Sequence, residues 1–205
     1  MRRWNSKYMA AAVGWSAIVI APGGAGAATV FVGDRVGFEA AIAALPGGIA
    51  AVVEDYEGFA AGDAIADGAT FNGITYDFSA TPVIGEVKAD GGTSGANTLG
   101  ADLAPGSFGT ADALGFTFAP AFAFGLEVVV SETLSSLFAG DINLAAAGVT
   151  ASNAAGDSPR EINGVEAFFV GVVDADAPFT SALLTFEPGG TTFTSIGQLD
   201  DLTLA

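Results

Sequence analysis

Carboxylates are the side chains in this sequence best suited to chemistry, since the chain holds 23 aspartates and glutamates. One acidic group lies in VVEDYEGF, residues 52–59, and another lies in the closing segment IGQLDDLTLA. Carboxylate oxygens are the ligands that Ca²⁺ prefers in proteins. The first and last strands of a β-sandwich often lie side by side, so the two groups could meet and form a calcium site. The predicted Ca²⁺ ligands are Glu54, Glu57, Asp200 and Asp201.

Asp200 raises a second question, because it shares strand parity with Leu202 and Leu204. If the two leucines face the core, Asp200 also points inward, and an unpaired inward carboxylate costs several kcal/mol. We therefore expect Asp200 to have backbone N–H donors, a cation, or a place at the open rim. The alternative for all these acidic residues is that they are solvated at strand ends or cap turns.

Two further acidic pairs have weaker patterns. Asp174 and Asp176 in GVVDADAPF are two residues apart, which is more typical of an acidic turn between strands than of a ligand site. Asp141 with Asn143 is a weaker candidate still. No EF-hand loop or calcium-binding repeat is present in the sequence.

The residue types that are missing exclude several reaction classes. The chain has no cysteine and no histidine, so it has no disulfide framework, no thiol nucleophile, no Ser-His-Asp triad and no imidazole zinc site. A glycoside hydrolase that uses a pair of carboxylates stays open as a lesser alternative. No pair stands out among 23 acidic residues, so we predict a protein that is not an enzyme, with no catalytic residues.

The first 27 residues have the order of a secretory signal peptide. Arg2, Arg3 and Lys7 precede the apolar run 9–21, and the small residues 25–27 follow it. The apolar run is too short to span a bilayer comfortably, although an uncleaved anchor and twin-arginine export both stay open. We expect one mature domain over residues 28–205, with no membrane span.

Removal of the leader would leave a strongly acidic chain. Three basic residues would remain, namely Arg35, Lys88 and Arg160, and the formal charge would change from −17 to 3 − 23 = −20. Nucleic acid is excluded as a partner because phosphate binding requires a basic patch, and an anionic membrane surface would repel the chain. Divalent cations are the natural counter-ions.

Apolar residues alternate with polar ones in several short segments separated by Gly, Pro and Asp. In ITYDFS the inward residues are Ile74, Tyr76 and Phe78, and similar alternation occurs in GFTF, AFAFGLEVVV (122–130 on even positions) and SALLTFE. AFFVGVV is apolar on both parities, which indicates a central strand. This pattern predicts an all-β fold of antiparallel strands, either a β-sandwich or a barrel. The Gly-rich segment 85–115 is predicted to be a long loop with at most one short strand.

One segment has helical spacing. After Asp34, the apolar residues Phe38, Ile42 and Leu45 recur every three or four positions, and Pro46-Gly47-Gly48 follows. Asp34 can cap the first turn, and the proline with two glycines can end the helix. We expect one short N-terminal amphipathic helix that packs on the sandwich.

The order of these segments resembles a known family. A leader is followed by DRVGFEAAIAAL, VVEDYEGFAAGDAI, GATFNGITYDFS, GFTFAPAFAFGLEV, FFVGVVDADAPFTSALLTF and IGQLDDLTLA. Together they resemble the extracellular domain of bacterial PEP-CTERM-type exported proteins. The resemblance implies a jelly-roll-like sandwich exported by a Gram-negative bacterium and associated with exopolysaccharide or the cell surface. The sequence ends at Ala205 without the family's Pro-Glu-Pro anchor, so we expect either a released product or a longer natural chain.

Three functions follow from these observations. The first is a non-catalytic secreted or cell-surface sandwich associated with extracellular matrix, exopolysaccharide or other surface components. The second is a calcium-stabilised carbohydrate-binding module, since jelly-roll modules of that kind often hold a structural Ca²⁺ between an early acidic residue and a late Asp. Both tryptophans lie in the leader, so the aromatic platforms for a sugar would have to come from phenylalanines near Gly or Pro, such as Phe59, Phe108 and Phe179. The third is the carboxylate-pair hydrolase.

Overall fold

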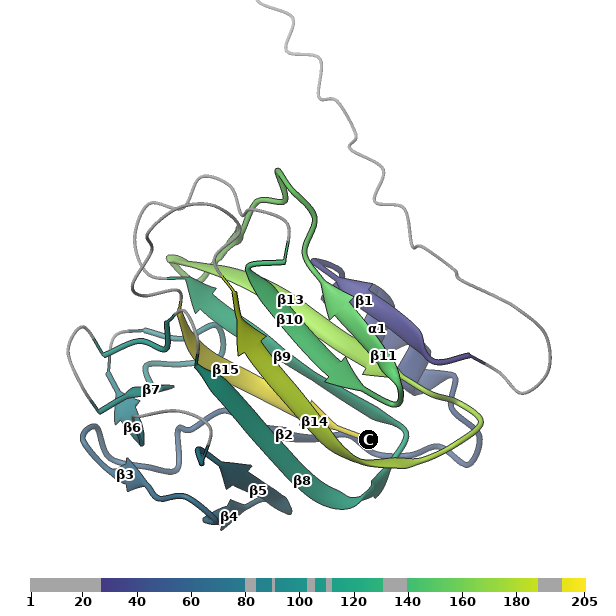
Figure 1. Cartoon of the computed structure of the whole chain (residues 1–205), viewed down its shortest axis with the longest axis horizontal. Helices are drawn as coiled ribbons and strands as arrows, with labels where there is room; N and C mark the ends of the chain where they lie inside the picture. Colours follow the sequence, from purple (N-terminus) through teal and green to yellow (C-terminus); the bar gives the residue numbers. More distant parts are fainter. Residues whose placement is uncertain are drawn as a thin grey trace, which may run out of the picture.

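The structure is a computed structural model, and it describes residues 27–79, 84–89, 91–102, 106–109, 112–130, 140–187 and 197–205. Nearly all of the predicted signal peptide lies outside these residues. So does Pro188-Gly189-Gly190, whose residue types indicate a turn between strands. Within them the chain forms two antiparallel sheets packed face to face, with one short helix (Figure 1). The all-β sandwich, one of the two folds expected from the alternating pattern, is therefore confirmed.

The larger layer, sheet A, carries the helix on its outer face. Its strands in spatial order are β1 Thr29–Val32, β13 Val165–Val173, β9 Ala123–Val130, β15 Gly197–Leu204, β7 Thr98–Ala101, β6 Gly85–Lys88 and β3 Ala64–Ile65. Two more strands pair at its borders, β12 Arg160–Ile162 with β13 and β2 Val52–Glu54 with β15.

The second layer, sheet B, is made of six strands. In spatial order these are β11 Val149–Ser152, β10 Ile142–Ala146, β14 Phe179–Phe186, β8 Ala113–Ala121, β5 Ile74–Asp77 and β4 Thr70–Phe71. From β8 onward the chain passes from one sheet to the other after every one or two strands, which is jelly-roll-like. The segments AFFVGVV and SALLTFE, which the alternating pattern predicted as strands, lie in β13 and β14.

The main core lies between the two sheets and is rich in aromatic rings. Ile74, Tyr76 and Phe78 all face it, as expected, and Phe116 packs on Phe124 of the opposite sheet with ring centroids 5.1 Å apart. Burial of this aromatic and aliphatic surface is the dominant favourable contribution to folding.

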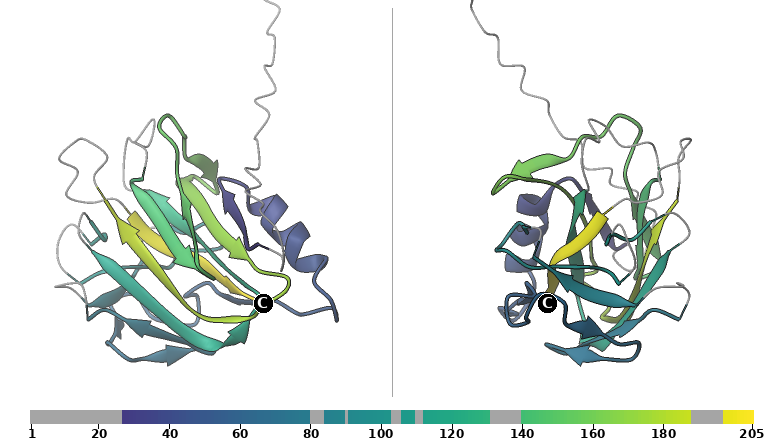
Figure 2. Two further views of the ribbon diagram at one scale, coloured as in Figure 1. Left: turned by 45° about the vertical axis from the view of Figure 1, so that its right-hand side comes forward. Right: turned by 90° about the vertical axis from the view of Figure 1, so that its left-hand side faces the viewer.

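The helix α1, Arg35–Ala43, begins at its predicted cap. Oδ1 of Asp34 accepts a hydrogen bond of 2.8 Å from the N–H of Gly37. Phe38, Ile42 and Leu45 form a second apolar cluster against the outer face of sheet A, and the helix is seen beside β1 in Figure 2. No helix in the described ranges is long and apolar enough to cross a membrane.

Three expectations about local structure were wrong. Segment 85–115 was expected to hold at most one strand, but both β6 and β7 lie in it. Its glycines are needed for close packing, since a Cβ at Gly85 would lie 2.8 Å from Cδ1 of Leu99. Phe122 lies at the bend between β8 and β9 and packs in the outer cluster rather than the core. Phe108 is fully buried, so it offers no platform for a sugar.

Candidate functional site

A β-bulge in β15 decides where the two late aspartates lie. Asp200 pairs with Glu127 of β9 and Thr203 pairs with Gly125, so one extra residue stands on β15 between these pairs. Asp201 takes a left-handed backbone conformation with φ of 50°. The bulge reverses the side-chain alternation. The expectation that Asp200 shares a face with Leu202 was therefore wrong, because Asp200 lies with Glu127 on the outer face of sheet A.

Asp200 is completely buried, and hydrogen-bond donors surround its carboxylate. The backbone N–H groups of Thr93 and Ser94 donate to its Oδ2 at 2.6 and 3.1 Å, and the Thr93 hydroxyl donates at 2.9 Å. The N–H of Asp201 donates to Oδ1 at 2.8 Å. Backbone donors were one of the three expected ways to satisfy this group. Burial raises the pKa of Asp200, and the neighbouring charge of Asp201 raises it further.

Two arginines neutralise the other buried carboxylates of this face. Nη1 of Arg35, from α1, lies 2.5 Å from Oδ2 of Asp201 and 3.6 Å from Oε1 of Glu127. Nη2 of Arg160, from β12, donates to the same Oε1 of Glu127. Burial raises the pKa of Glu127, and the charge of Arg160 opposes the increase. These ion pairs join the helix and β12 to the middle of sheet A.

This cluster is closed to a bulky substrate. Neither Glu127 nor Asp200 exposes any surface, and loop 91–97 covers Asp200 so closely that a Cβ at Gly92 would lie 2.5 Å from its Oδ2. A cavity of about 30 Å³ lies beside Arg160, room for about one water molecule. The cluster therefore has the chemistry of a buried structural network in this conformation.

The early acidic group approaches the late one only in part. Strand β2 pairs with β15, as the sequence led us to expect, and Glu54 stands opposite Leu202. Oε1 of Glu54 accepts the N–H of Tyr56 and Oε2 accepts Nδ2 of Asn72, both at 2.9 Å. Burial raises the pKa of Glu54.

Glu57 is held at the other end of loop 91–97. Its Oε1 accepts the N–H of Asn97 at 2.6 Å, while Asp200 accepts from Thr93 and Ser94 of the same loop. Over the described ranges, no three acidic side chains gather closely enough to hold a metal ion. A Ca²⁺ bound by Glu54, Glu57, Asp200 and Asp201 remains a prediction.

Of the other two candidates, one lies in a turn and the other at the start of β10. Oδ1 of Asp174 accepts the N–H groups of Asp176 and Ala177 at 3.1 and 3.0 Å, which closes the turn between β13 and β14. Asn143 donates through Nδ2 to the carbonyl of Gly140 and accepts at Oδ1 from the Ser152 hydroxyl. These side chains hold the local backbone.

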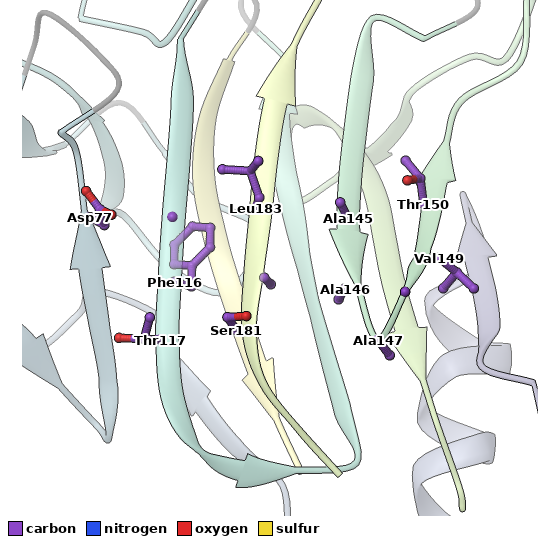
Figure 3. A pocket seen from close by; sticks show the side chains of 13 residues that line it. Asp77, Phe116, Thr117, Ala145, Ala146, Ala147, Val149, Thr150, Ser181 and Leu183 are labelled. Carbon is purple, nitrogen blue, oxygen red and sulfur yellow. The ribbon is translucent and has the colours of Figure 1, made fainter. Parts of the chain in front are cut away.

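The outer face of sheet B carries an open groove of about 460 Å³ that crosses five strands (Figure 3). Its lining consists mainly of small and hydroxyl-bearing residues with a single carboxylate. They are Asp77, Gly115, Phe116, Thr117, Ala145, Ala146, Ala147, Gly148, Val149, Thr150, Ser181, Ala182 and Leu183. This volume lies in the range of about 300–1,000 Å³ typical of ligand sites.

Strand register aligns the groove residues in rows across the sheet. Cross-strand partners share a face, so each row can be followed from pair to pair. The hydroxyl row consists of Thr117 and Ser181, and Thr75 continues it beside the groove. The central row consists of Asp77, Gly115, Leu183, Ala145 and Thr150. With strands about 4.8 Å apart, four steps of the central row span about 19 Å.

The central row combines three kinds of contact. Leu183 stands between Gly115 and Ala145 with 43% of its surface exposed, so an apolar contact is flanked by two depressions. Asp77 supplies a charge at one end and Thr150 supplies a hydroxyl at the other. A ligand lying across the strands would meet hydrogen-bonding groups, an apolar side chain and a carboxylate in turn.

Hydrogen bonds from Ser79 hold the Asp77 carboxylate in its ionised form. The N–H of Ser79 donates to Oδ1 at 2.8 Å, and the bonds from the Ser79 hydroxyl and N–H lower the pKa of Asp77. The side chain is therefore a fixed negative charge at the surface of sheet B.

Sequence reasoning identified Glu54, Asp200 and Asp201 among the buried acidic residues, but it missed Glu127 and this groove. The signal that could have found the groove is Leu183, an apolar residue on the polar side of an alternating strand. Three phenylalanines were considered as sugar platforms. Phe59 and Phe179 are partly buried against the core, and Phe108 lies fully within it. Comparison with protein-family models gave no match, and comparisons with curated proteins and with solved structures gave no significant similarity.

Proposed function

We propose that this chain is a non-catalytic, exported β-sandwich that binds a segment of extracellular polysaccharide in the groove of sheet B. The observation that carries the proposal is the groove itself, with its central and hydroxyl rows aligned by strand register. A polysaccharide offers many hydroxyl groups, and Thr117, Ser181 and Thr150 can exchange hydrogen bonds with them. An open groove suits part of a long chain, because the remainder can continue beyond both ends.

The cellular setting of this proposal comes from the sequence. The leader supports export, and the resemblance to PEP-CTERM-type proteins supports the exterior of a Gram-negative bacterium, in matrix or on the cell surface. The strong negative charge favours neutral or cationic chains over anionic ones. A groove without tryptophan, contacting sugars through hydroxyls and one leucine, indicates weak contacts repeated along a polymer.

Affinity electrophoresis tests this function. The purified protein is run through gels cast with neutral polysaccharides or with an amine-bearing polysaccharide, and its retardation is compared with that in a plain gel. The variant Ala145→Gln fills a depression of the central row with a neutral side chain, so it is expected to lose retardation.

The matched control is Ala43→Gln, the same substitution at an exposed position of α1 on the other sheet. It is expected to migrate like the parent protein. Thermal melts confirm that both variants are folded. Absence of retardation by every polysaccharide, or equal retardation of Ala145→Gln and its parent, would refute binding in this groove.

A further inference from the structure

One depression of the groove has a floor without a side chain. Gly115 of β8 lies between Asp77 of β5 and Leu183 of β14 in the central row. Two strand spacings separate the flanking residues, about 10 Å between their backbones. A Cβ at Gly115 would lie 3.0 Å from Cβ of Asp77 and 3.4 Å from its Oδ2. Glycine therefore keeps the space beside this carboxylate open. Figure 3 shows Asp77 and Leu183 on the two strands that flank β8.

The charge in this depression has no basic partner in the groove. Asp77 is the only ionisable residue among those that line it. The basic residues beyond the leader are engaged elsewhere, Arg35 and Arg160 on the outer face of sheet A and Lys88 with Glu86 at 2.8 Å. The N–H of Ser79 donates to the carboxylate, and the acidic side chain of Asp67 lies beside it. The side chains of the groove therefore present an uncompensated negative charge to whatever lies over Gly115.

The opposite wall of the depression is apolar. Leu183 is exposed and stands next to Gly115, while the hydroxyl of Thr117 lies one row away on the same strand as Gly115. A sugar ring has an apolar face and polar edges, so it can lay one face against Leu183 and direct a substituent towards Asp77. A substituent that is a cation gains most from that position.

We propose that the depression over Gly115 is a subsite for an amine-bearing sugar unit, whose ammonium group pairs with Asp77 while its ring contacts Leu183. This inference rests on the proposed function and names the class of polysaccharide: chains that carry free amino groups. Because the pair is exposed to water, we expect it to favour the amine over a neutral counterpart by about two- to fivefold. Salt screens exposed charges, so the preference is expected to shrink at high ionic strength.

Glucosamine oligomers and their N-acetylated counterparts make a matched pair of ligands, because they differ in charge and not in backbone. Dissociation constants for both are measured by calorimetry at low and high salt. The expected result is tighter binding of the free amine by the parent protein. Asp77→Asn is expected to reduce this preference to near one without weakening binding of the acetylated oligomer.

A control for non-specific attraction is needed because the protein is so acidic. Glu161→Gln removes one exposed charge from β12 on the other sheet and is expected to keep the full preference. Gly115→Val keeps the charge but fills the depression, so it is expected to weaken both oligomers.

The outcomes separate the subsite from the function it rests on. If the parent protein binds both oligomers equally and Ala145→Gln binds them less well, the subsite is refuted but binding in the groove is supported. An equal loss in Asp77→Asn and Glu161→Gln also overturns the subsite, since the preference would then be general electrostatic attraction. Failure of the parent protein to bind either oligomer or any polysaccharide refutes the proposed function as well.

Discussion

Two glycines in sheet A make room for the helix, and their replacement is expected to lower the unfolding free energy. Gly125 of β9 and Gly171 of β13 are cross-strand partners, and the buried ring of Phe38 lies over both. A Cβ at Gly171 would lie 2.8 Å from Cδ2 of Phe38 and 2.9 Å from Cζ of Phe169. The two rings already touch, with centroids 4.9 Å apart. Neither ring can move aside freely in a packed interior.

The expected magnitudes follow from this overlap. Gly171→Ala adds a methyl group to a filled space, which costs about 1–3 kcal/mol of unfolding free energy. The lower entropy of alanine in the unfolded chain offsets about 0.4–1 kcal/mol of that cost. Phe38→Ala removes a completely buried ring and is expected to cost about 3–5 kcal/mol. That is a large part of the about 5–15 kcal/mol that holds a typical domain folded.

A double-mutant cycle, measured by urea denaturation, tests whether the two changes share one space. In the Phe38→Ala background the Phe169 ring can shift into the vacated volume and make room for the new methyl group of Gly171→Ala. The cost of that methyl group is therefore expected to fall to zero or become a small gain. The coupling energy is then about 1–3 kcal/mol. Gly58→Ala is the control, because a Cβ there meets no atom within 4 Å. Additive costs of Gly171→Ala and Phe38→Ala would refute this account of how the helix is seated.

Three other predictions concern stability. The two-residue turn between β10 and β11 has Ala147 in a left-handed conformation with φ of 50°. Asparagine adopts this conformation more readily than alanine, so Ala147→Asn is expected to raise the unfolding free energy by about 1 kcal/mol. A lower melting temperature of the variant would contradict this. Burial raises the pKa values of Glu127, Asp200 and Glu54 from 4.5, 3.8 and 4.5, so the folded state holds their protons more tightly than the unfolded chain. The contribution of these three carboxyl groups to the unfolding free energy is therefore complete below about pH 4 and is lost as pH rises through their folded pKa values. Melting curves between pH 3.5 and 7 check this. A Ca²⁺ bound at the predicted acidic ligands would raise the melting temperature relative to EDTA, and Asp200→Asn would abolish that rise; identical melts in Ca²⁺ and EDTA would exclude the site.

The helix and the inward strand faces could be predicted because their signals are local. Asp34 caps the turn that follows it, and Phe38 and Ile42 lie one turn apart in the sequence as in the structure. The alternation of Ile74, Tyr76 and Phe78 likewise follows from strand geometry alone. Each of these features depends on residues within about ten positions of one another.

The orientation of the late aspartates could not be predicted, because a bulge shifts the period of two by one residue. Asp201 adopts its left-handed conformation where its carboxylate meets Arg35, 166 positions earlier in the chain. Asp200 receives its donors from Thr93 and Ser94, more than 100 positions away. The residues around DDLTL do not indicate these distant partners. The alternation of side chains along a regular strand therefore assigned Asp200 to the wrong face.

The groove has the same kind of origin. Gly115, Leu183 and Ala145 lie in one row only because β8, β14 and β10 are neighbours in a particular register. In each separate strand these residues are ordinary outward positions. Apart from the outward Leu183, a surface built from single residues on several strands leaves no signal in the sequence, so its extent can be recognised only after the strands are placed.

The distribution of basic residues constrains what any surface of this protein can bind. Arg35 and Arg160 form ion pairs with the buried Glu127, and Lys88 forms one with Glu86. Among the residues that the structure describes, most of the exposed carboxylates therefore form no ion pair with these three cations. The outer surface attracts positive charge over a distance of about 8–10 Å at ordinary salt. A polysaccharide rich in uronic acid would be repelled before it reached the groove, whereas a neutral or amine-bearing chain would not. The arginines that hold the helix on sheet A are therefore not available to balance negative charge on sheet B. For this reason the groove of sheet B favours neutral or cationic ligands.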